Sequence, residues 1–533
     1  MAYTGAATSL VQHGTLRVPT GEWDRPDSTS ALSLWPPGYP AALALPMELG
    51  LSPIQSGRWI NVVAAAITAL VVGLLVASAA GSGAGLVAVL VVFATQAVFD
   101  AHLSVLSEPL FIALMVLTLA AMVRARDQLW LLALLATATV MVRYAGGAAA
   151  AAVVCWTFFD SRYAMRRRFR RALGVALLPA IALLVWFVRT ARAPDRHATP
   201  EITIDGAWGD AISQARDTVA SWLVPILAPG MPRRIIAALL LVALAVFIIM
   251  AARDTMSERG SSRSGARRST RELARFGAAR PELVAPIIGA AMLLAAWYVA
   301  IVVASRAFVG GAIPFDWRIL APLFVLVEIM AVVAVGYWWR AYHRPLHIVI
   351  GIVAIAWIAA AVVVTFNDAQ WAATEGSDFA SSDWRDSPLV AWVRANGRGH
   401  SLYSNWPAAL YFHAHRIARE LPDSTDAPEL PAFGRTVVAQ RAYVVAFDAP
   451  SPDFIPPDSL AQRLGWQRVV RVADGTVWQA GIAAAQDSVA RDSTLRDSAG
   501  ARPAPATTAT PPAATAPAAT APVTPVGGAS PRG

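Results

Sequence analysis

The chain has 533 residues, of which 56% are hydrophobic and 15% are charged. Its mean hydropathy is +0.50. Soluble globular proteins carry about 25% charged residues, so the composition excludes that class and predicts a polytopic membrane protein. The net charge is +9, and the sequence contains arginine but no lysine. The surplus arginines lie between apolar segments, which argues against a nucleic-acid partner. The single cysteine, Cys155, excludes an intrachain disulfide.

Ten apolar segments predict membrane-spanning helices. Several hold only about 15 residues, fewer than the roughly 20 that a straight span needs, so we expect these to be thin, tilted or shielded by neighbours. The predicted spans are residues 57–80, 84–99, 106–123, 128–142, 145–159, 172–188, 235–250, 281–304, 319–339 and 346–366.

The arginines between these spans fall mainly on alternate loops, which predicts the topology. The positive-inside rule assigns the arginine-rich loops to the cytoplasm. The C-terminal part of the chain then lies outside, and we expect a multi-pass membrane protein. Eighteen arginines lie in the predicted inner loops, at residues 124–126, 162–171, 253–280 and 340–344.

Composition divides the chain into four regions. Residues 1–56 form a polar, extracytoplasmic N-terminal segment, and residues 57–366 form the helical membrane core. Residues 367–482 are predicted to be a small extracytoplasmic α/β domain. Residues 483–533 are rich in Ala, Pro and Thr and hold too little apolar surface to fold, which predicts a disordered tail.

Within the predicted outer domain, residues 400–405 (HSLYSN) and 441–447 (RAYVVAF) are typical of short strands. Residues 469–480 form a hairpin pattern around Asp474-Gly475, a pair that suits a tight turn. We expect helices at 388–394 and 408–414. A packing or acceptor-docking module without catalysis is the simplest reading of this domain.

Two loops are long. Residues 253–280 are polar, basic and rich in Ser and Gly, which indicates a flexible inner loop. The outer loop at 190–232 contains apolar residues at helical spacing. We expect a helix there that either lies in the membrane interface with Trp222 as an anchor or packs over a cavity.

Polar residues gather at the predicted outer ends of the spans. Residues 35–40 (WPPGYP), with Tyr39, predict a rigid turn, because proline and glycine do not extend a helix. Asp100, His102 and Glu108 fall within nine residues at the membrane rim. Carboxylates can act as bases toward a hydroxyl and histidine can position it, although interfacial anchoring is the simpler role.

Three further groups belong to the same face. Arg143 and Tyr144 separate two short spans, and snorkelling is their simplest role. Arg318 would lie at head-group depth, where a guanidinium can bind phosphate through two hydrogen bonds, with Asp316 holding it in place. Glu328 lies about 15 Å further along the same predicted helix, and we expect it to hydrogen-bond a neighbouring helix.

Taken in order, these motifs resemble the GT-C membrane glycosyltransferases, especially bacterial relatives of protein O-mannosyltransferases and of lipid A aminoarabinose transferases. No nucleotide-binding glycine pattern and no zinc-spaced Cys/His set occurs in the sequence. The likeness covers residues 1–480 and is carried by PPGYP, GRWIN at 57–61, HLSVLSEPLF at 102–111, VRYAGG at 142–147, FDWRILAPL at 315–323 and LYSNWPAALYF at 402–412.

The resemblance implies transfer of a sugar, with inversion, from a polyprenyl-phosphate carrier to a glycan, lipid or protein acceptor outside the membrane. It implies no cofactor and no metal. In such enzymes the base is an acid in the first outer loop, and residues 2–14 resemble the segment after that acid, so we expect a true start upstream of Met1. Glu108 and Asp100 are the catalytic candidates in this chain. The substrate-binding candidates are Tyr39, His102, Arg143, Tyr144, Asp316 and Arg318.

Two other functions remain open from the sequence. A transporter of lipid-linked sugars would often show internal repeats and polar residues at mid-membrane depth; no repeat is evident, and the polar residues favour the rim. A non-catalytic scaffold of the same fold would bind a lipid-linked sugar or a partner without transfer.

Overall fold

The computed structural model describes residues 1–19, 29–193, 208–261, 279–308, 314–341, 344–422, 430–449 and 455–480. The chain divides into one compact unit, residues 1–481, and a second unit, residues 482–533. The predicted tail and most of the predicted inner loop at 253–280 lie outside the described residues.

The N-terminal segment is more helical than the sequence predicts. It contains α1 (Ala2–His13), the short antiparallel strands β1 (Arg17–Val18) and β2 (Ser30–Ala31), and α2 (Gly38–Glu48). The rigid turn predicted at residues 35–40 is wrong in its second half, because α2 begins at Gly38 and contains Pro40. Proline is tolerated in the first turn of a helix, where no backbone N–H partner is lost.

Gly38 brings α2 very close to a later helix. A Cβ atom on Gly38 would lie 2.5 Å from the carbonyl oxygen of Met141 and 3.0 Å from the backbone nitrogen of Val142. Such distances are shorter than van der Waals contact, so only glycine fits here without displacing one of the two backbones.

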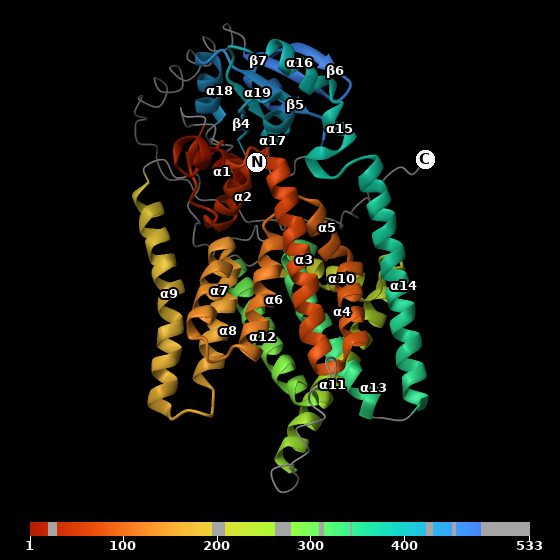
Figure 1. Cartoon of the computed structure of the whole chain (residues 1–533). Helices are drawn as coiled ribbons and strands as arrows, with labels where there is room; N and C mark the ends of the chain where they lie inside the picture. Colours follow the sequence, from red (N-terminus) through yellow and green to blue (C-terminus); the bar gives the residue numbers. More distant parts are fainter. Residues whose placement is uncertain are drawn as a thin grey trace, which may run out of the picture. The chain divides into compact units, whose positions relative to one another are not determined.

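The membrane core is an α-helical bundle, and all ten predicted spans fall on its helical segments (Figure 1). The first helix begins with a capping box between Ser52 and Gln55 and with Pro53 in its first turn. The helices of this region are α3 (Pro53–Ala80), α4 (Ser82–Ala94), α5 (Gln96–Leu103), α6 (Glu108–Arg124), α7 (Leu129–Val142), η1 (Tyr144–Gly146), α8 (Gly147–Phe158), α9 (Met165–Arg192), α10 (Trp208–Leu223), α11 (Met231–Ser261), η4 (Pro281–Leu283), α12 (Val284–Phe308), α13 (Trp317–Ala341) and α14 (Arg344–Thr374).

Among the described residues, six helices are long and apolar enough to cross a membrane, and α4 with α5 would make a seventh. Helices α7 and α8 are shorter apolar helices, so the total of about ten spans stays a prediction. The second predicted span is not one straight helix, because α4 and α5 meet at Thr95 with a bend of 66°.

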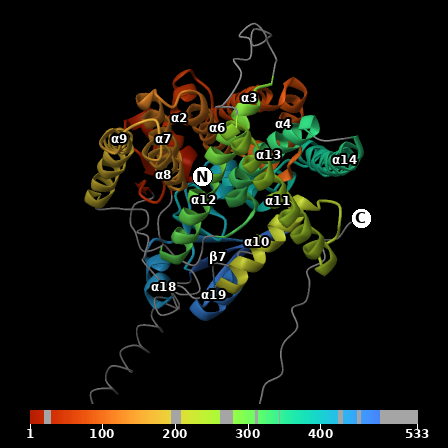
Figure 2. The ribbon, with the colours of Figure 1, turned by 90° about the horizontal axis from the view of Figure 1, so that it is seen from below.

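Burial separates central from peripheral helices. In α13, 61% of the most apolar stretch is buried, against 17% in α14 and 22% in α9. Helices α9 and α14 lie on opposite sides of the bundle in both views (Figures 1 and 2). Their apolar side chains are exposed and are not covered by other parts of the protein, which is the pattern expected of side chains that face lipid. The chain is therefore a multi-pass membrane protein.

The C-terminal domain is α/β, as predicted. Its five-stranded sheet has the order β4-β3-β5-β7-β6, with β3 parallel to both β4 and β5. The Asp474-Gly475 hairpin is confirmed, since β6 and β7 pair antiparallel with Val472 opposite Gly475. The strands are β3 (Leu402–Ser404), β4 (Arg419–Glu420), β5 (Tyr443–Phe447), β6 (Trp466–Val472) and β7 (Gly475–Ala480).

The helices of this domain are also close to prediction. The first predicted helix, residues 388–394, is α16. The second, residues 408–414, consists of one α-helical turn, α17, followed by the five-residue π-helix η6. The elements are η5 (Asp378–Ala380), α15 (Ser382–Arg385), α16 (Pro388–Asn396), α17 (Pro407–Ala409), η6 (Leu410–Ala414), α18 (Leu430–Ala439) and α19 (Pro457–Leu464).

Candidate functional site

Glu108 is the centre of a buried ion-pair network. It begins α6, followed by Pro109 in the first turn, and its side chain is 1% exposed. Its Oε1 lies 2.6 Å from Nη1 of Arg143 and 3.1 Å from Nη2 of Arg318. The network thus joins Glu108 to arginines that lie 35 and 210 positions later in the sequence. The two cations offset the cost of burying the carboxylate.

Arg143 is the inner arginine of this network. It follows the end of α7 in an extended conformation and donates a hydrogen bond of 3.0 Å to Oγ of Ser107. Its guanidinium lies 6.0 Å from the ring centroid of Phe111, within cation–π range. Burial alone would lower the pKa of Arg143, but the Glu108 carboxylate raises it above its usual value, so the side chain stays charged.

Arg318 is the outer arginine. It lies in the first turn of α13 and its side chain is 43% exposed. It lines a cavity of about 820 Å³ together with Arg58 and Arg385, which we call the cationic cavity. Among the described residues that line it, none is Asp or Glu. An anionic ligand would therefore meet three guanidiniums and no lining carboxylate.

Aromatic side chains from the C-terminal domain form another wall of the cationic cavity. Trp384 and Trp406 lie 5.5 Å apart between ring centroids, and Phe379 lies within 6.1 Å of both. Phe412 and His413, from the π-helix, line the same space. This domain therefore contributes directly to the cavity. The sequence analysis quoted Trp406 and Phe412 within the LYSNWPAALYF motif but did not predict that any of these residues lines a site.

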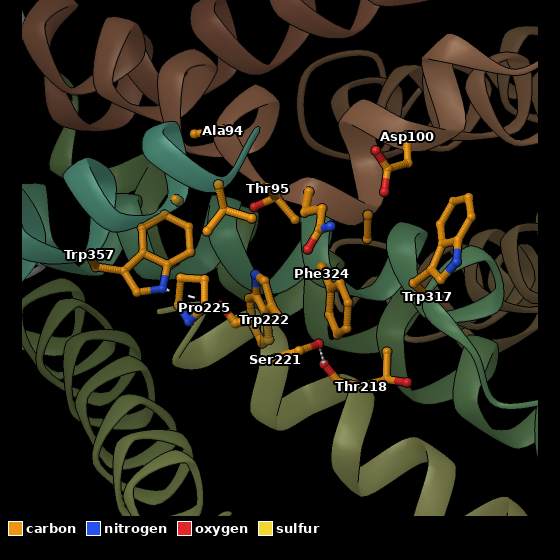
Figure 3. A pocket seen from close by; sticks show the side chains of 14 residues that line it. Ala94, Thr95, Asp100, Thr218, Ser221, Trp222, Pro225, Trp317, Phe324 and Trp357 are labelled. Carbon is orange, nitrogen blue, oxygen red and sulfur yellow. Dashed lines mark hydrogen bonds between the residues drawn. The ribbon is translucent and has the colours of Figure 1, made fainter. Parts of the chain in front are cut away.

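Asp100 lies in a second, smaller cavity of about 200 Å³ (Figure 3). Trp222, Phe324 and Trp357 also line it. We call it the aromatic cavity. Trp317 lines both cavities, and its neighbour Arg318 lines only the cationic one. The two predicted carboxylates are thus in different surroundings: Glu108 in the ion-pair network and Asp100 beside the aromatic cavity.

Besides Arg143, which belongs to the ion-pair network, four of the predicted binding residues line neither cavity. Nδ1 of His102 lies 2.7 Å from the carbonyl oxygen of Val98, and the Tyr39 side chain is fully buried. The Tyr144 hydroxyl accepts a hydrogen bond of 2.9 Å from Nε1 of Trp186. These three side chains therefore pack within the fold, away from both cavities, and a role in binding stays a prediction.

Asp316, the fourth, has a different role from the one predicted. Its Oδ1 accepts a hydrogen bond of 3.0 Å from the backbone N–H of Ile319. A carboxylate here satisfies one of the first free N–H groups of α13 and suits the positive end of the helix dipole. The carboxylate that holds Arg318 is Glu108, more than 200 residues away in the sequence.

Glu328 behaves as predicted. It is 3% exposed and accepts hydrogen bonds from the Thr95 hydroxyl, at the α4–α5 bend, and from Nε1 of Trp222 at 2.9 Å. Trp222 stacks on Phe324 with 4.4 Å between ring centroids. Helix α10 therefore packs over a cavity through Trp222, the second of the two alternatives for this segment.

Ser107 and Tyr3 are the network residues that the sequence did not single out. The two hydroxyls lie 3.4 Å apart, and Tyr3 also lines the cationic cavity. The sequence signal that could have placed Ser107 in the network is its position directly before Glu108. Among the described residues, no group of three or more His, Cys, Asp or Glu side chains is placed to hold a metal ion.

No family model matches the chain, and no curated protein matches it. Similar solved structures include ArnT from Cupriavidus metallidurans in the apo state, with 15% identity and a TM-score of 0.43 over 91% of this chain and 93% of that one. The structure of ArnT from Cupriavidus metallidurans bound to undecaprenyl phosphate has 14% identity and a TM-score of 0.40, over 91% of this chain and 94% of that one. Because both TM-scores are below 0.5, the proposed function rests on the residues of this chain alone.

Proposed function

We propose that this protein is a membrane glycosyltransferase of the bacterial inner membrane. It moves a sugar from a polyprenyl-phosphate carrier to an acceptor hydroxyl on the extracytoplasmic face, where the C-terminal domain lies. The observation that carries the proposal is Arg318, held by the buried Glu108 at the wall of the cationic cavity. A lipid phosphate fits this surface because its chain can lie among apolar helices while its charge meets guanidinium groups.

Arg318 would stabilise the leaving group. As the bond between the anomeric carbon and the phosphate oxygen breaks, the electron pair stays on the phosphate, which gains negative charge. A guanidinium already fixed by Glu108 stabilises that charge without reorganising. Arg143 acts through Glu108, because its side chain is only 16% exposed and does not line the cavity.

The base is proposed to be Asp100. Glu108 is 1% exposed and its Oε1 is shared by two arginines, so it is poorly suited to accept a proton from a substrate. Asp100 lines a cavity open to a ligand. It would take the proton of the acceptor hydroxyl as the acceptor oxygen bonds to the anomeric carbon from the face opposite the phosphate, which inverts the configuration.

A second candidate function is binding of the carrier without transfer. The observation that favours it is the lack of Asp and Glu among the described residues that line the cationic cavity. A protein of this kind would need the arginines and the aromatic wall but no base. Both candidates predict binding of the carrier phosphate, and only the first predicts a glycosylated product.

The test compares lipid and glycan profiles of a deletion strain complemented with variants, alongside binding of undecaprenyl phosphate to purified protein in lipid nanodiscs. Wild type should restore a glycosylated product that R318Q does not restore. The matched control is R398Q, an exposed arginine outside both cavities, and it should behave like wild type. Full restoration by R318Q would refute the proposal, and carrier binding with no changed glycan would favour the binding protein.

A further inference from the structure

The aromatic cavity lies where five helices meet, namely α4, α5, α10, α13 and α14. Its walls come from the α4–α5 bend (Thr95, Gln96), from α10 (Trp222), from α13 (Phe324) and from α14 (Trp357). Figure 3 shows Thr95, Trp222, Phe324 and Trp357 around one space. Its volume of about 200 Å³ is roughly a quarter of the 820 Å³ of the cationic cavity, so it suits a small ligand.

The aromatic walls are held in place by hydrogen bonds. Nε1 of Trp222 donates to Glu328, and Nε1 of Trp357 donates to the carbonyl oxygen of Trp222 at 3.3 Å. Trp222 stacks on Phe324 at an interplanar angle of 11°. Rings fixed in this way offer preformed flat surfaces, so a ligand would lose little affinity to ordering them.

Polar side chains line the rest of the cavity. Asp100, Gln96, Thr218 and Ser221 come from two separate parts of the chain. Ser221 donates to the carbonyl oxygen of Thr218 at 2.7 Å, and a hydroxyl that donates can still accept. Flat rings beside carboxylate, amide and hydroxyl groups match a ligand with apolar C–H faces and a hydroxylated edge.

We propose that the aromatic cavity is a binding site for a single sugar ring. The C–H groups of a pyranose carry partial positive charge and suit the negative faces of aromatic rings, while its hydroxyls pair with the polar side chains. Trp317 lines this cavity and the cationic one, so the bond between the sugar and the phosphate at Arg318 would lie beside it. The inference rests on the proposed function only in taking the sugar to be the group transferred.

The experiment measures binding of free sugars to the full chain in nanodiscs by saturation-transfer NMR, without any carrier lipid. The probes are glucose, mannose, N-acetylglucosamine and arabinose, with sorbitol as the open-chain control. At least one cyclic sugar should give a signal that sorbitol does not give. S221F, which fills the cavity, should abolish it, and T218V, which removes one hydroxyl at constant shape, should weaken binding about tenfold.

The matched control is S213F, which places the same bulk on α10 at a residue that does not line the cavity. It should bind sugar like wild type. The inference is overturned if no cyclic sugar binds, or if S221F binds as well as S213F. Binding of undecaprenyl phosphate, measured in parallel, separates the two proposals: carrier binding without sugar binding removes this inference alone, and sugar binding without carrier binding removes the proposed function.

Discussion

Glu108 and Asp127 each lie between two arginines, and burial gives these two carboxylates different roles. Glu108 is 1% exposed between Arg143 and Arg318. Asp127, in the loop between α6 and α7, is 53% exposed, with Arg162 at 3.1 Å and Arg171 at 3.0 Å. The distances are alike, so geometry alone does not distinguish them.

The difference lies in what water would do if one partner were removed. At Asp127 water can replace a lost guanidinium, and exposed pairs contribute about 0–1 kcal/mol. At Glu108 water has little access, so loss of a partner leaves an uncompensated buried charge. Ion pairs should therefore be read as site-forming only where at least one partner is shielded, and the predictions below test that distinction.

The largest effect is expected at Glu108. Glu108→Ala leaves the half-buried Arg143 without its carboxylate and should lower the free energy of unfolding by about 3–5 kcal/mol, measured by thermal denaturation in detergent. Carrier binding should also fall, because Arg318 loses its anchor. Glu48→Ala, an exposed acid at the end of α2, is the control. A loss below 1 kcal/mol at Glu108 would mean that the network is not shielded.

The next effect concerns activity. Arg318→Gln should reduce the rate of sugar transfer about 10²–10³-fold, as loss of a group that stabilises transition-state charge does. Because Arg318 is 43% exposed, its effect on thermal stability should be smaller than that of Glu108→Ala. Arg318→Lys should recover part of the rate, since it keeps the charge but not the two-pronged donor. Equal rates in wild type and Arg318→Gln would contradict the assignment.

A smaller effect is expected at Arg143. Arg143→Lys keeps the charge but cannot maintain both the ion pair with Glu108 and the hydrogen bond to Ser107. The free energy of unfolding, measured by thermal denaturation in detergent, should therefore fall by about 1.5–3 kcal/mol. The affinity for carrier phosphate should change little, as Arg143 does not line the cavity. A large loss of carrier affinity with unchanged stability would place Arg143 on the ligand instead.

The smallest effect is expected at Asp127. Hydrogen bonding from Arg162 lowers the pKa of Asp127 to about 2 from its usual 3.8. Its ion pairs are therefore complete above pH 4 and are lost only as the pH falls toward 2, so no pH dependence should arise from it between pH 5 and 8. Asp127→Asn should change stability by less than about 1 kcal/mol, and less at high salt. A larger change would remove the contrast with Glu108.

The sequence located the end of the helical bundle that holds the candidate site, but it predicted few of the side-chain contacts at that end. Apolar periodicity and arginine bias located the helices and brought Glu108, Arg143 and Arg318 to one region. The same reasoning grouped Asp100 and His102 with Glu108 because they are close in sequence. Spacing along a chain does not give the 66° bend at Thr95, and that bend precedes both residues.

Side-chain direction was the other limit. Tyr144 and Asp316 lie next to network arginines in the sequence, yet Tyr144 pairs with Trp186 and Asp316 caps α13. Backbone groups at helix ends are strong local partners, and sequence alone does not show whether a side chain satisfies them or a ligand. The place of the C-terminal aromatic wall at the cavity was not predicted, because its contact with the cavity depends on tertiary packing.

The close approach at Gly38 links the N-terminal segment to the position of Arg143. A Cβ atom at position 38 would push against Met141 and Val142, the two residues that immediately precede the arginine. In related sequences, a side chain at this position should therefore occur only together with a change at the end of α7 or with loss of the arginine. An aligned set of homologues in which position 38 varies freely beside an unchanged arginine would show that the two backbones can separate without moving the ion pair.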